Sequence, residues 1–531
     1  MQITTAAEAS ARDADAIAAG IDSWALMHAA GTAAAEFIRM ITASVGATEI
    51  SVWAGSGNNG GDAYVVAAHL MTHTTFRVKL TATGEPKSPD AKRARDLYLE
   101  AKKTAPPFPD VIATTEEVHF VFVDGLLGTG QHGALRAPER EITELFNQHR
   151  RAGWTVLALD LPTGVNATTG DVAAHALRAD YTLAFGTMKR AHLLKRDQCG
   201  EVIVFDIGLG EFAEKEDGAW TLADAAMLHS RVPAITWDAH KGTRGKLAIV
   251  GGAEGMAGAV VLASQAALRS GAGLVYAHVN QASVLPLQIS VSQAIASAFD
   301  TDRISAQLDG MHAVVIGPGF GRTRESEKSL NALLKTLITD YPKLPVAIDA
   351  DALTLIGSDA NRLALLAEGR EVVCTPHVRE FERLIGKPVA DTLEDRIEQA
   401  RELVAQTGCT ILLKGTPTVV LAPGVPSAIV IPRGTPVLAT GGSGDMLSGM
   451  IGTLLAQGAS AADAAAIAAW VHGRAAEIAT ETAGSVRGVT LHEVMCAMPD
   501  AWRELSVQPS VPHKWPVQLA SLPRVWSDSE S

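Results

Sequence analysis

The strongest catalytic pattern in this chain is ATGGSGDMLSGMIGTLLAQG, which begins at Ala439. Gly441, Gly442 and Gly444 allow a tight turn whose N–H groups can point at an anion, and the helix predicted to begin near Asp445 directs its positive end to the same place. Such a cradle suits a phosphoryl group during transfer, when charge spreads over its oxygens. Asp445 could accept the proton of a substrate hydroxyl. A helix cap is the alternative role for Asp445, but a cap needs one residue and not a GGSGD loop.

Two further side chains in the same half follow apolar runs. Lys414 ends the run TILLK and could neutralise a nucleotide phosphate, although a solvated strand-end lysine is the simpler alternative. His377 follows VVCTP. A single histidine is more often a structural hydrogen-bond partner, and the sequence has no HExxH or similar metal-binding spacing. We therefore interpret His377 as a substrate contact and not as a proton carrier.

Three segments of the first half place an Asp or Asn beside glycines after a strand-like run. They are GSGNNGGDAYVVAAHL from Gly55, DGLLGTG from Asp124 and DLPTG from Asp160. Glycines let backbone N–H groups approach a ligand, and a helix N-terminus favours phosphate. Each Asp could instead cap the turn or helix that follows. Three such strand ends together favour a site over three independent caps.

The elements that would position these residues are short apolar runs that alternate with helical patterns. Most runs are apolar throughout, which is typical of strands buried on both faces of a parallel sheet covered by helices. The predicted strands are EISVWAG, FRVKLTA, VHFVFVDG, TVLALDLP, YTLAFG and VIVFDIG, then KLAIVGG, LVYAHV, AVVIGPG, VAIDADAL, VVCTPH and TILLKG. The charged segment FAEKEDGAW separates the two series. We therefore predict two α/β domains, at residues 1–225 and 226–505, and a loosely ordered extension at 506–531.

Composition excludes several classes of protein. The chain has 531 residues, of which 47% are hydrophobic and 19% charged, so it can bury large cores and is neither disordered nor fibrous. Its net charge of −13, with no basic cluster, argues against nucleic acids and anionic membranes as partners. The start of the chain lacks a signal-peptide pattern and no apolar run reaches bilayer length. Four dispersed cysteines suit a reducing compartment, so we expect a cytoplasmic protein.

The first half resembles the NAD(P)H-hydrate epimerase domain. NNGGD, DGLLGTG and DLPTGVNATTG carry the likeness, with Ala63 and Thr163 where that family usually has Gly and Ser. The resemblance implies a Rossmann-like three-layer αβα fold, Asp160 as acid or base, and a potassium ion on Asn59, Asp124 and Thr163, whose hard oxygens suit an alkali cation. The residues implied to bind the hydrated nicotinamide nucleotide are Asn58, Asn59, Gly60, Gly61, Asp62, Gly128, Thr129, Gly130, Gln131, His132, Gly133, Ala134 and Asp160.

The second half resembles the ribokinase-like superfamily and, within it, the ADP-dependent NAD(P)H-hydrate dehydratase. HKG, GGAEG, GPGFG, DADAL, TPH, KGTPT and ATGGSGD carry the likeness, with Thr435 where Asn is usual. The resemblance implies a ribokinase-like αβα fold with Asp445 as catalytic base. The implied substrate contacts are Ala259, Gly321, His377 and Asp445, and the implied ADP or AMP contacts are Lys414, Gly415, Thr416, Pro417, Thr418 and Gly444.

Together these resemblances imply a bifunctional enzyme, an isomerase and a lyase, that repairs hydrated NADH and NADPH. The first domain would interconvert the R and S hydrates, and the second would dehydrate the S form with ADP, giving AMP and phosphate. Mg²⁺ would neutralise the phosphates, bound mostly through them and water. We expect small-molecule substrates and a homo-oligomer. A ribokinase-like kinase that makes a stable phosphate ester, or a nucleotide-binding module without catalysis in the first domain, are the alternatives.

Overall fold

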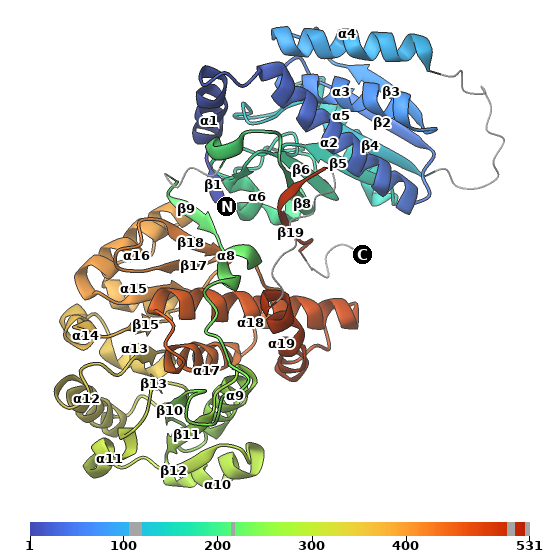
Figure 1. Ribbon diagram of the computed structural model, residues 1–531. Coiled ribbons are helices and arrows are strands. Elements are labelled where there is room, and N and C mark those ends of the chain that lie inside the picture. The colour runs from blue at the N-terminus through green and yellow to red at the C-terminus, as the bar shows by residue number, and fades with distance from the viewer. Residues whose placement is uncertain (106–118, 214–217, 507–515, 526–531) are drawn as a thin grey trace. The chain divides into compact units, whose positions relative to one another are not determined.

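The computed structural model describes residues 1–105, 119–213, 218–506 and 516–525. Its contacts divide the chain into two compact units (Figure 1). Unit 1 comprises residues 1–220 and 510–525, and unit 2 comprises residues 221–509 and 526–531. The division therefore falls five residues before the boundary that the sequence predicts at residue 225. The apolar runs on either side of it form the two separate cores described below.

Unit 1 contains a sheet in the order β19-β8-β6-β5-β4-β2-β3. The six strands from β8 to β3 are all parallel, and each matches a predicted apolar run. Their bounds are β2 (Glu49–Ala54), β3 (Arg77–Ala82), β4 (Phe120–Gly125), β5 (Thr155–Leu159), β6 (Tyr181–Phe185) and β8 (Glu201–Phe205). The short strands β1 (Gln2–Thr4) and β7 (Met188–Lys189) pair in parallel and are not part of this sheet.

Both faces of the unit 1 sheet are buried. Alternate residues of β4 and β5, such as Val123 and Leu157, pack with the helices α2 (Ser23–Ser44) and α3 (Asn58–His73). Their neighbours Phe122 and Val156 pack with α5 (Glu139–Arg151) on the other face. This two-sided burial explains why the strands are apolar throughout. The remaining helices are α1 (Ala6–Ala18), α4 (Pro89–Thr104), α6 (Arg190–Leu194) and α7 (Arg196–Cys199).

The order of the strands creates a switch point between β2 and β4. The chain leaves β2 into α3 on one face of the sheet, whereas it leaves β4 toward α5 on the opposite face. In open α/β sheets, ligands bind in the crevice outside the carboxyl ends of strands where the connections diverge in this way. The NNGGD segment follows β2 and the DGLLGTG segment begins at the end of β4, so both lie at this edge.

The predicted loosely ordered extension needs a correction. Helix α19 (Leu491–Ser506) ends where the extension was predicted to begin, but β19 (Gln518–Leu522) pairs antiparallel with β8 as an edge strand of unit 1. The backbone N–H of Asp206 donates to the carbonyl of Val517, and Arg196 donates to that of Pro523. Residues 507–515 and 526–531 of that extension lie outside the described residues.

Unit 2 contains a sheet in the order β12-β11-β10-β13-β14-β15-β16-β17-β18-β9. The strands from β12 to β16 are parallel, and β17 and β18 are antiparallel. Six of these strands match predicted runs, and four were not predicted. The bounds are β9 (Trp220–Leu222), β10 (Lys246–Gly251), β11 (Leu274–Val279), β12 (Ile295–Ala298), β13 (Ala313–Ile316), β14 (Val346–Ile348), β15 (Val372–Cys374), β16 (Thr410–Leu413), β17 (Thr418–Leu421) and β18 (Ala428–Ile431).

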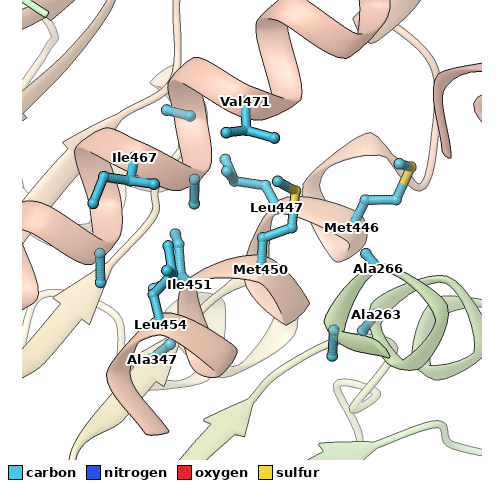
Figure 2. Close-up of a cluster of buried hydrophobic side chains, with 14 of the residues drawn as sticks. Ala263, Ala266, Ala347, Met446, Leu447, Met450, Ile451, Leu454, Ile467 and Val471 are labelled. Atoms are coloured by element: carbon cyan, nitrogen blue, oxygen red, sulfur yellow. The ribbon is translucent and has the colours of Figure 1, made fainter. Parts of the chain in front are cut away.

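Helix α17 (Ser443–Ala456) lies at the centre of the unit 2 core. Figure 2 shows its side chains, among them Met450 and Leu454, between α9 (Ala257–Arg269), α18 (Ala461–Ala483) and the sheet residue Ala347. A Cβ added at Gly449 would lie 2.0 Å from the carbonyl oxygen of Ala263, so α9 and α17 touch through their backbones. This packing fixes the helix whose first turn carries Asp445.

The other helices of unit 2 complete a layered α/β unit. They are α8 (Ala225–His229), α10 (Gln281–Ser290), α11 (Ile304–Leu308), α12 (Arg324–Thr339), α13 (Ala350–Ile356), α14 (Ala360–Ala367), α15 (Val378–Ile385), α16 (Leu393–Thr407) and α19. The predicted class, α/β with two domains, is confirmed. Within the described ranges, no helix is both long and apolar enough to cross a bilayer.

Candidate active sites

The NNGGD segment forms the first turns of α3 at the switch point of unit 1. Gly60 faces the preceding loop, where an added Cβ would lie 1.9 Å from the carbonyl oxygen of Gly55. Asn59 is 8% exposed, and its Nδ2 donates to the carbonyl of Leu127 at 3.0 Å. Its Oδ1 is buried and, among the described residues, has no hydrogen-bond partner. A buried oxygen without a donor is what a cation ligand needs.

Asp124 is the second-last residue of β4 and is fully buried. Its Oδ2 accepts a hydrogen bond from the N–H of Thr163 at 2.8 Å, and its Oδ1 accepts from the Thr163 hydroxyl at 2.8 Å and from the N–H of Leu126 at 3.1 Å. Burial raises the pKa of Asp124 to about 6, although these hydrogen bonds lower it. The Thr163 hydroxyl, which replaces the usual Ser, also accepts from the N–H of Leu127 at 3.2 Å. Asp124 and Thr163 are thus in contact, and Leu127 links them to Asn59.

The loop at 128–134 lies beside this cluster. A Cβ added at Gly128 would be 3.3 Å from that of Asn59. Within the loop, Gln131 donates to the carbonyl of Gly133, and His132 shares a hydrogen bond of 3.1 Å with Asn166. The loop therefore adjoins the start of α3, as the sequence predicts. Ala63, the departure from the usual Gly, is fully buried and fits because Gly125 opposite it has no side chain.

Asp160 follows β5 in a left-handed conformation, with φ of 60°. Such a backbone is uncommon for a residue with a side chain and often marks a functional site. Its Oδ1 accepts a hydrogen bond from Nζ of Lys189 at 2.6 Å, and its carbonyl oxygen lies 2.7 Å from Nε2 of His192. The Nδ1 of His192 in turn accepts from the N–H of Lys189 at 3.1 Å. Burial lowers the pKa of His192 to about 4. The imidazole that links the Asp160 carbonyl to the Lys189 N–H is therefore neutral.

Sequence reasoning missed Lys189 and His192. Lys189 is 4% exposed and donates a second hydrogen bond, to the carbonyl of Phe185 at 3.0 Å. The sequence feature that could have indicated Lys189 is its position soon after the predicted strand YTLAFG, but lysines at such positions are often solvated. Two more carboxyls surround this ion pair. Burial, and then the charge of Asp160, raise the pKa of Asp62 well above its usual value, and burial also raises the pKa of Asp13 on α1.

The glycine loops of unit 2 meet at the carboxyl ends of its parallel strands. A Cβ added at Gly319 would lie 3.1 Å from that of Ala259, so the loops after β10 and β13 touch. The N–H of Gly321 donates to Oδ2 of Asp351 at 2.9 Å. The structure therefore places Ala259, a predicted substrate contact, against Gly319, two residues before the predicted contact Gly321, whose N–H is held by Asp351.

Asp445 lies in the first turn of α17, after Gly442 with φ of 97°. The left-handed Gly442 supplies the turn that the GGSGD pattern predicts. Burial, followed by the negative charge of Asp349, raises the pKa of Asp445 to about 7, although the positive charge of Lys414 lowers it. A carboxylate that titrates near neutrality is suited to accept a proton. The cap residue of α17 is Gly442, and within the described ranges no hydrogen bond of the Asp445 side chain caps the helix.

Lys414 is not a solvated strand-end lysine. Its Nζ lies 2.6 Å from Oδ1 of Asp349, whose side chain is 2% exposed. A Cβ added at Gly444 would be 3.1 Å from the same Nζ, so the ammonium lies under the first turn of α17. The other predicted nucleotide contacts, residues 415–418, form the turn between β16 and β17, where the Thr418 hydroxyl donates to the carbonyl of Gly415 at 3.1 Å.

His377 begins α15 as its cap residue. Its Nδ1 accepts hydrogen bonds from the N–H groups of Arg379 at 3.1 Å and Glu380 at 3.4 Å, and Glu380 accepts from the N–H of His377. These acceptor bonds assign the proton of the neutral ring to Nε2. Burial, and then the charge of Lys414, lower the pKa of His377. Thr435, at the position usual for Asn, keeps a capping role because its hydroxyl accepts from the N–H of Val437.

Comparisons with known proteins match each unit to a known family. A family model described as NAD(P)H-hydrate dehydratase matches residues 247–500, and one described as YjeF-related protein N-terminus matches residues 23–191. The bifunctional NAD(P)H-hydrate repair enzyme Nnr of Coxiella burnetii is 34% identical over 479 residues, which are 88% of this chain and 93% of that protein. This chain belongs to the family of bifunctional NAD(P)H-hydrate repair enzymes. The prediction of the family and of an enzyme is thereby confirmed.

A second bifunctional relative agrees with this assignment. The Nnr enzyme of Escherichia coli is 34% identical to this repair enzyme and covers 86% of each chain. A solved structure of the ADP/ATP-dependent NAD(P)H-hydrate dehydratase from Bacillus subtilis, co-crystallised with ATP and Mg²⁺, is 28% identical, with a TM-score of 0.47. It covers 54% of this chain and 99% of its own.

Proposed function

We propose that unit 1 interconverts the R and S hydrates of NADH and NADPH, and that unit 2 uses ADP to dehydrate the S hydrate. Family membership supports the two activities, and the geometry supports the assignment of residues. The observation that carries the second step is Asp445. It has a pKa of about 7 and lies in the first turn of a helix whose N-terminus is a glycine turn, with Lys414 below it.

The dehydration begins with transfer of the substrate's hydroxyl proton to Asp445. The hydroxyl on C6 of the hydrated ring attacks the terminal phosphorus of ADP, its proton passes to Asp445, and AMP leaves. The helix N-terminus and Lys414 stabilise the charge that spreads over the phosphoryl oxygens. The ring nitrogen then expels phosphate from C6, and loss of a proton from C5 restores the double bond. Phosphorylation matters because phosphate is a far better leaving group than hydroxide.

Other residues of unit 2 would bind the two substrates. The turn at 415–418 is proposed to hold the nucleotide. Ala259, Gly321 and His377 are proposed to bind the hydrated dinucleotide. Magnesium would be carried on the phosphates of ADP and on water, where it neutralises their charge. The predicted homo-oligomer stays a prediction.

In unit 1 we assign the acid–base role to Asp160. Lys189 occupies its Oδ1 and, in the described part of the chain, its Oδ2 accepts no hydrogen bond, which leaves this oxygen for the substrate. Residues 58–62 and 128–134 would bind the nucleotide. A potassium ion fits Asn59, Asp124 and Thr163, because, among the residues that the structure describes, Asn59 Oδ1 accepts no hydrogen bond and no Lys or Arg side chain pairs with the buried carboxylate of Asp124. The ion would supply positive charge beside the bound substrate.

One assay tests the proposed function as a whole. The purified chain is incubated with a mixture of R and S hydrates of NADH and with ADP, while absorbance of the reduced ring and release of phosphate are followed. We expect complete recovery of NADH with one AMP and one phosphate per ring. A stable phosphate ester would instead indicate a small-molecule kinase, and recovery of the S fraction alone would indicate a first unit that binds without catalysis.

A further inference from the structure

Asp349 lies at the carboxyl end of β14 and precedes α13 as its cap residue, yet its side chain makes no capping hydrogen bond. Its Oδ1 accepts from Nζ of Lys414 at 2.6 Å, and its Oδ2 accepts from the hydroxyl of Ser448. The side chain is 2% exposed. The usual role of an Asp at this position, a helix cap, is therefore absent, and the carboxylate instead joins the end of β16 to the second turn of α17.

This ion pair lies directly beneath the phosphate cradle. A Cβ added at Gly444 would be 3.1 Å from Nζ of Lys414 and 3.6 Å from Oδ2 of Asp349. The lysine is thus fixed at the start of α17 before any nucleotide arrives. A long side chain that is already immobilised loses less conformational entropy on binding, which favours affinity.

The same carboxylate acts on Asp445 through its charge. Asp349 raises the pKa of Asp445, and Lys414 lowers it. Burial alone would raise the pKa of Asp349, but Lys414 and Ser448 lower it below its usual value, so the Asp349 carboxylate is negatively charged at neutral pH. Among the described residues, the other titratable and charged groups in the electrostatic surroundings of these three residues are Asp351, Cys374, His377, Glu380 and His472, with Arg322, Arg379 and Arg383 beside His377 and Glu380.

We propose that Asp349 is a positioning residue for dehydration, which holds the Lys414 ammonium at the phosphate cradle and sets the charge beside Asp445. This inference rests on the proposed function of unit 2 and adds to it a residue that does not itself touch the reacting atoms. Replacing the Asp349 carboxylate should therefore have two effects, on nucleotide binding and on the pH dependence of the rate. Loss of packing alone would not produce both effects together.

The test compares Asp349→Asn with the wild-type chain and with Asp359→Asn, a matched control at an exposed helix cap. ADP binding is measured as the rise in unfolding temperature that ADP causes, and as KM for ADP. Dehydration of the S hydrate is measured as kcat/KM against pH. For Asp349→Asn we expect a threefold to tenfold rise in KM, roughly the cost of immobilising one side chain, and weaker protection by ADP. The acidic limb should move to lower pH by about one unit, because a charge that opposes ionisation of Asp445 is gone.

A folded Asp349→Asn chain with wild-type ADP protection and an unmoved acidic limb overturns the inference. Should that variant fail to fold, Lys414→Met tests the pair from its other side. It must raise KM for ADP and weaken protection by ADP, and wild-type ADP binding in that variant also overturns the inference. If the wild-type chain recovers no NADH, the proposed function fails, and the loss or retention of ADP protection in Asp349→Asn still decides whether Asp349 positions Lys414.

Discussion

Lys189 Nζ and Asp160 Oδ1 lie 2.6 Å apart in unit 1, with the lysine 4% and the aspartate 14% exposed at their side chains. Removing one partner of a buried pair leaves an uncompensated charge, which costs about 3–5 kcal/mol. We therefore expect Lys189→Met to lower the free energy of unfolding by about this amount, and Lys189→Met combined with Asp160→Asn to lower it less. Thermal unfolding of the full chain measures both. Equal loss in the single and double variants would contradict the pairing.

Asp160→Asn should abolish epimerisation and leave dehydration intact, since the two sites lie in separate units. With a mixed pool of hydrates, the variant should consume the S form and leave the R form behind, apart from its spontaneous conversion. Chromatography of the two epimers over time measures this, and Asp96→Asn on exposed α4 is the control. Consumption of both epimers at the wild-type rate would reject Asp160 as the acid or base.

Potassium should bind at Asn59 and Asp124 and stabilise unit 1. A ligand that binds only the folded state raises the unfolding temperature, by roughly 2–4 °C per kcal/mol for a unit of this size. Replacing potassium by tetramethylammonium should therefore lower the unfolding temperature and slow epimerisation, with dehydration of the S form unchanged. Asn59→Ala should remove the dependence on potassium. Equal unfolding temperatures of the wild-type chain in the two salts would speak against the site.

Dehydration should depend on a base with a pKa of about 7. The base must be ionised, so kcat/KM should be constant above that pH and fall as pH drops through it, by about tenfold at one unit below. The direction follows from burial, which raises the pKa of Asp445 by disfavouring its charged form. A rate that stays constant down to pH 5 would show that this carboxylate is not the base.

The sequence was sufficient to predict twelve strands of the two sheets, because apolar runs such as AVVI and TVLAL are buried on both faces. It was also sufficient to place the glycine loops at the ends of those strands. The edge strand β19 was missed because QLASL is mostly exposed, and its pairing depends on β8, which lies more than three hundred residues earlier.

The partners of the catalytic candidates could not be predicted from the sequence. Lys189 reaches Asp160 only because β7 and α6 turn back toward the end of β5, and His192 fixes that turn. Asp349 resembles a helix cap in sequence, since it directly precedes a helix, and only the position of Lys414 shows another use of its carboxylate. Local patterns indicate strand ends, whereas ion pairs between strand ends depend on the whole sheet.

The most direct test of Asp445 as the base for phosphoryl transfer is to measure both half-reactions of Asp445→Asn in one sample of mixed hydrates with ADP. We predict that recovery of NADH slows by about 10²–10⁴-fold, the usual effect of losing a general base, while the R and S forms still equilibrate at nearly the wild-type rate. Recovery of NADH at the wild-type rate would contradict the account, and so would equal loss of both activities.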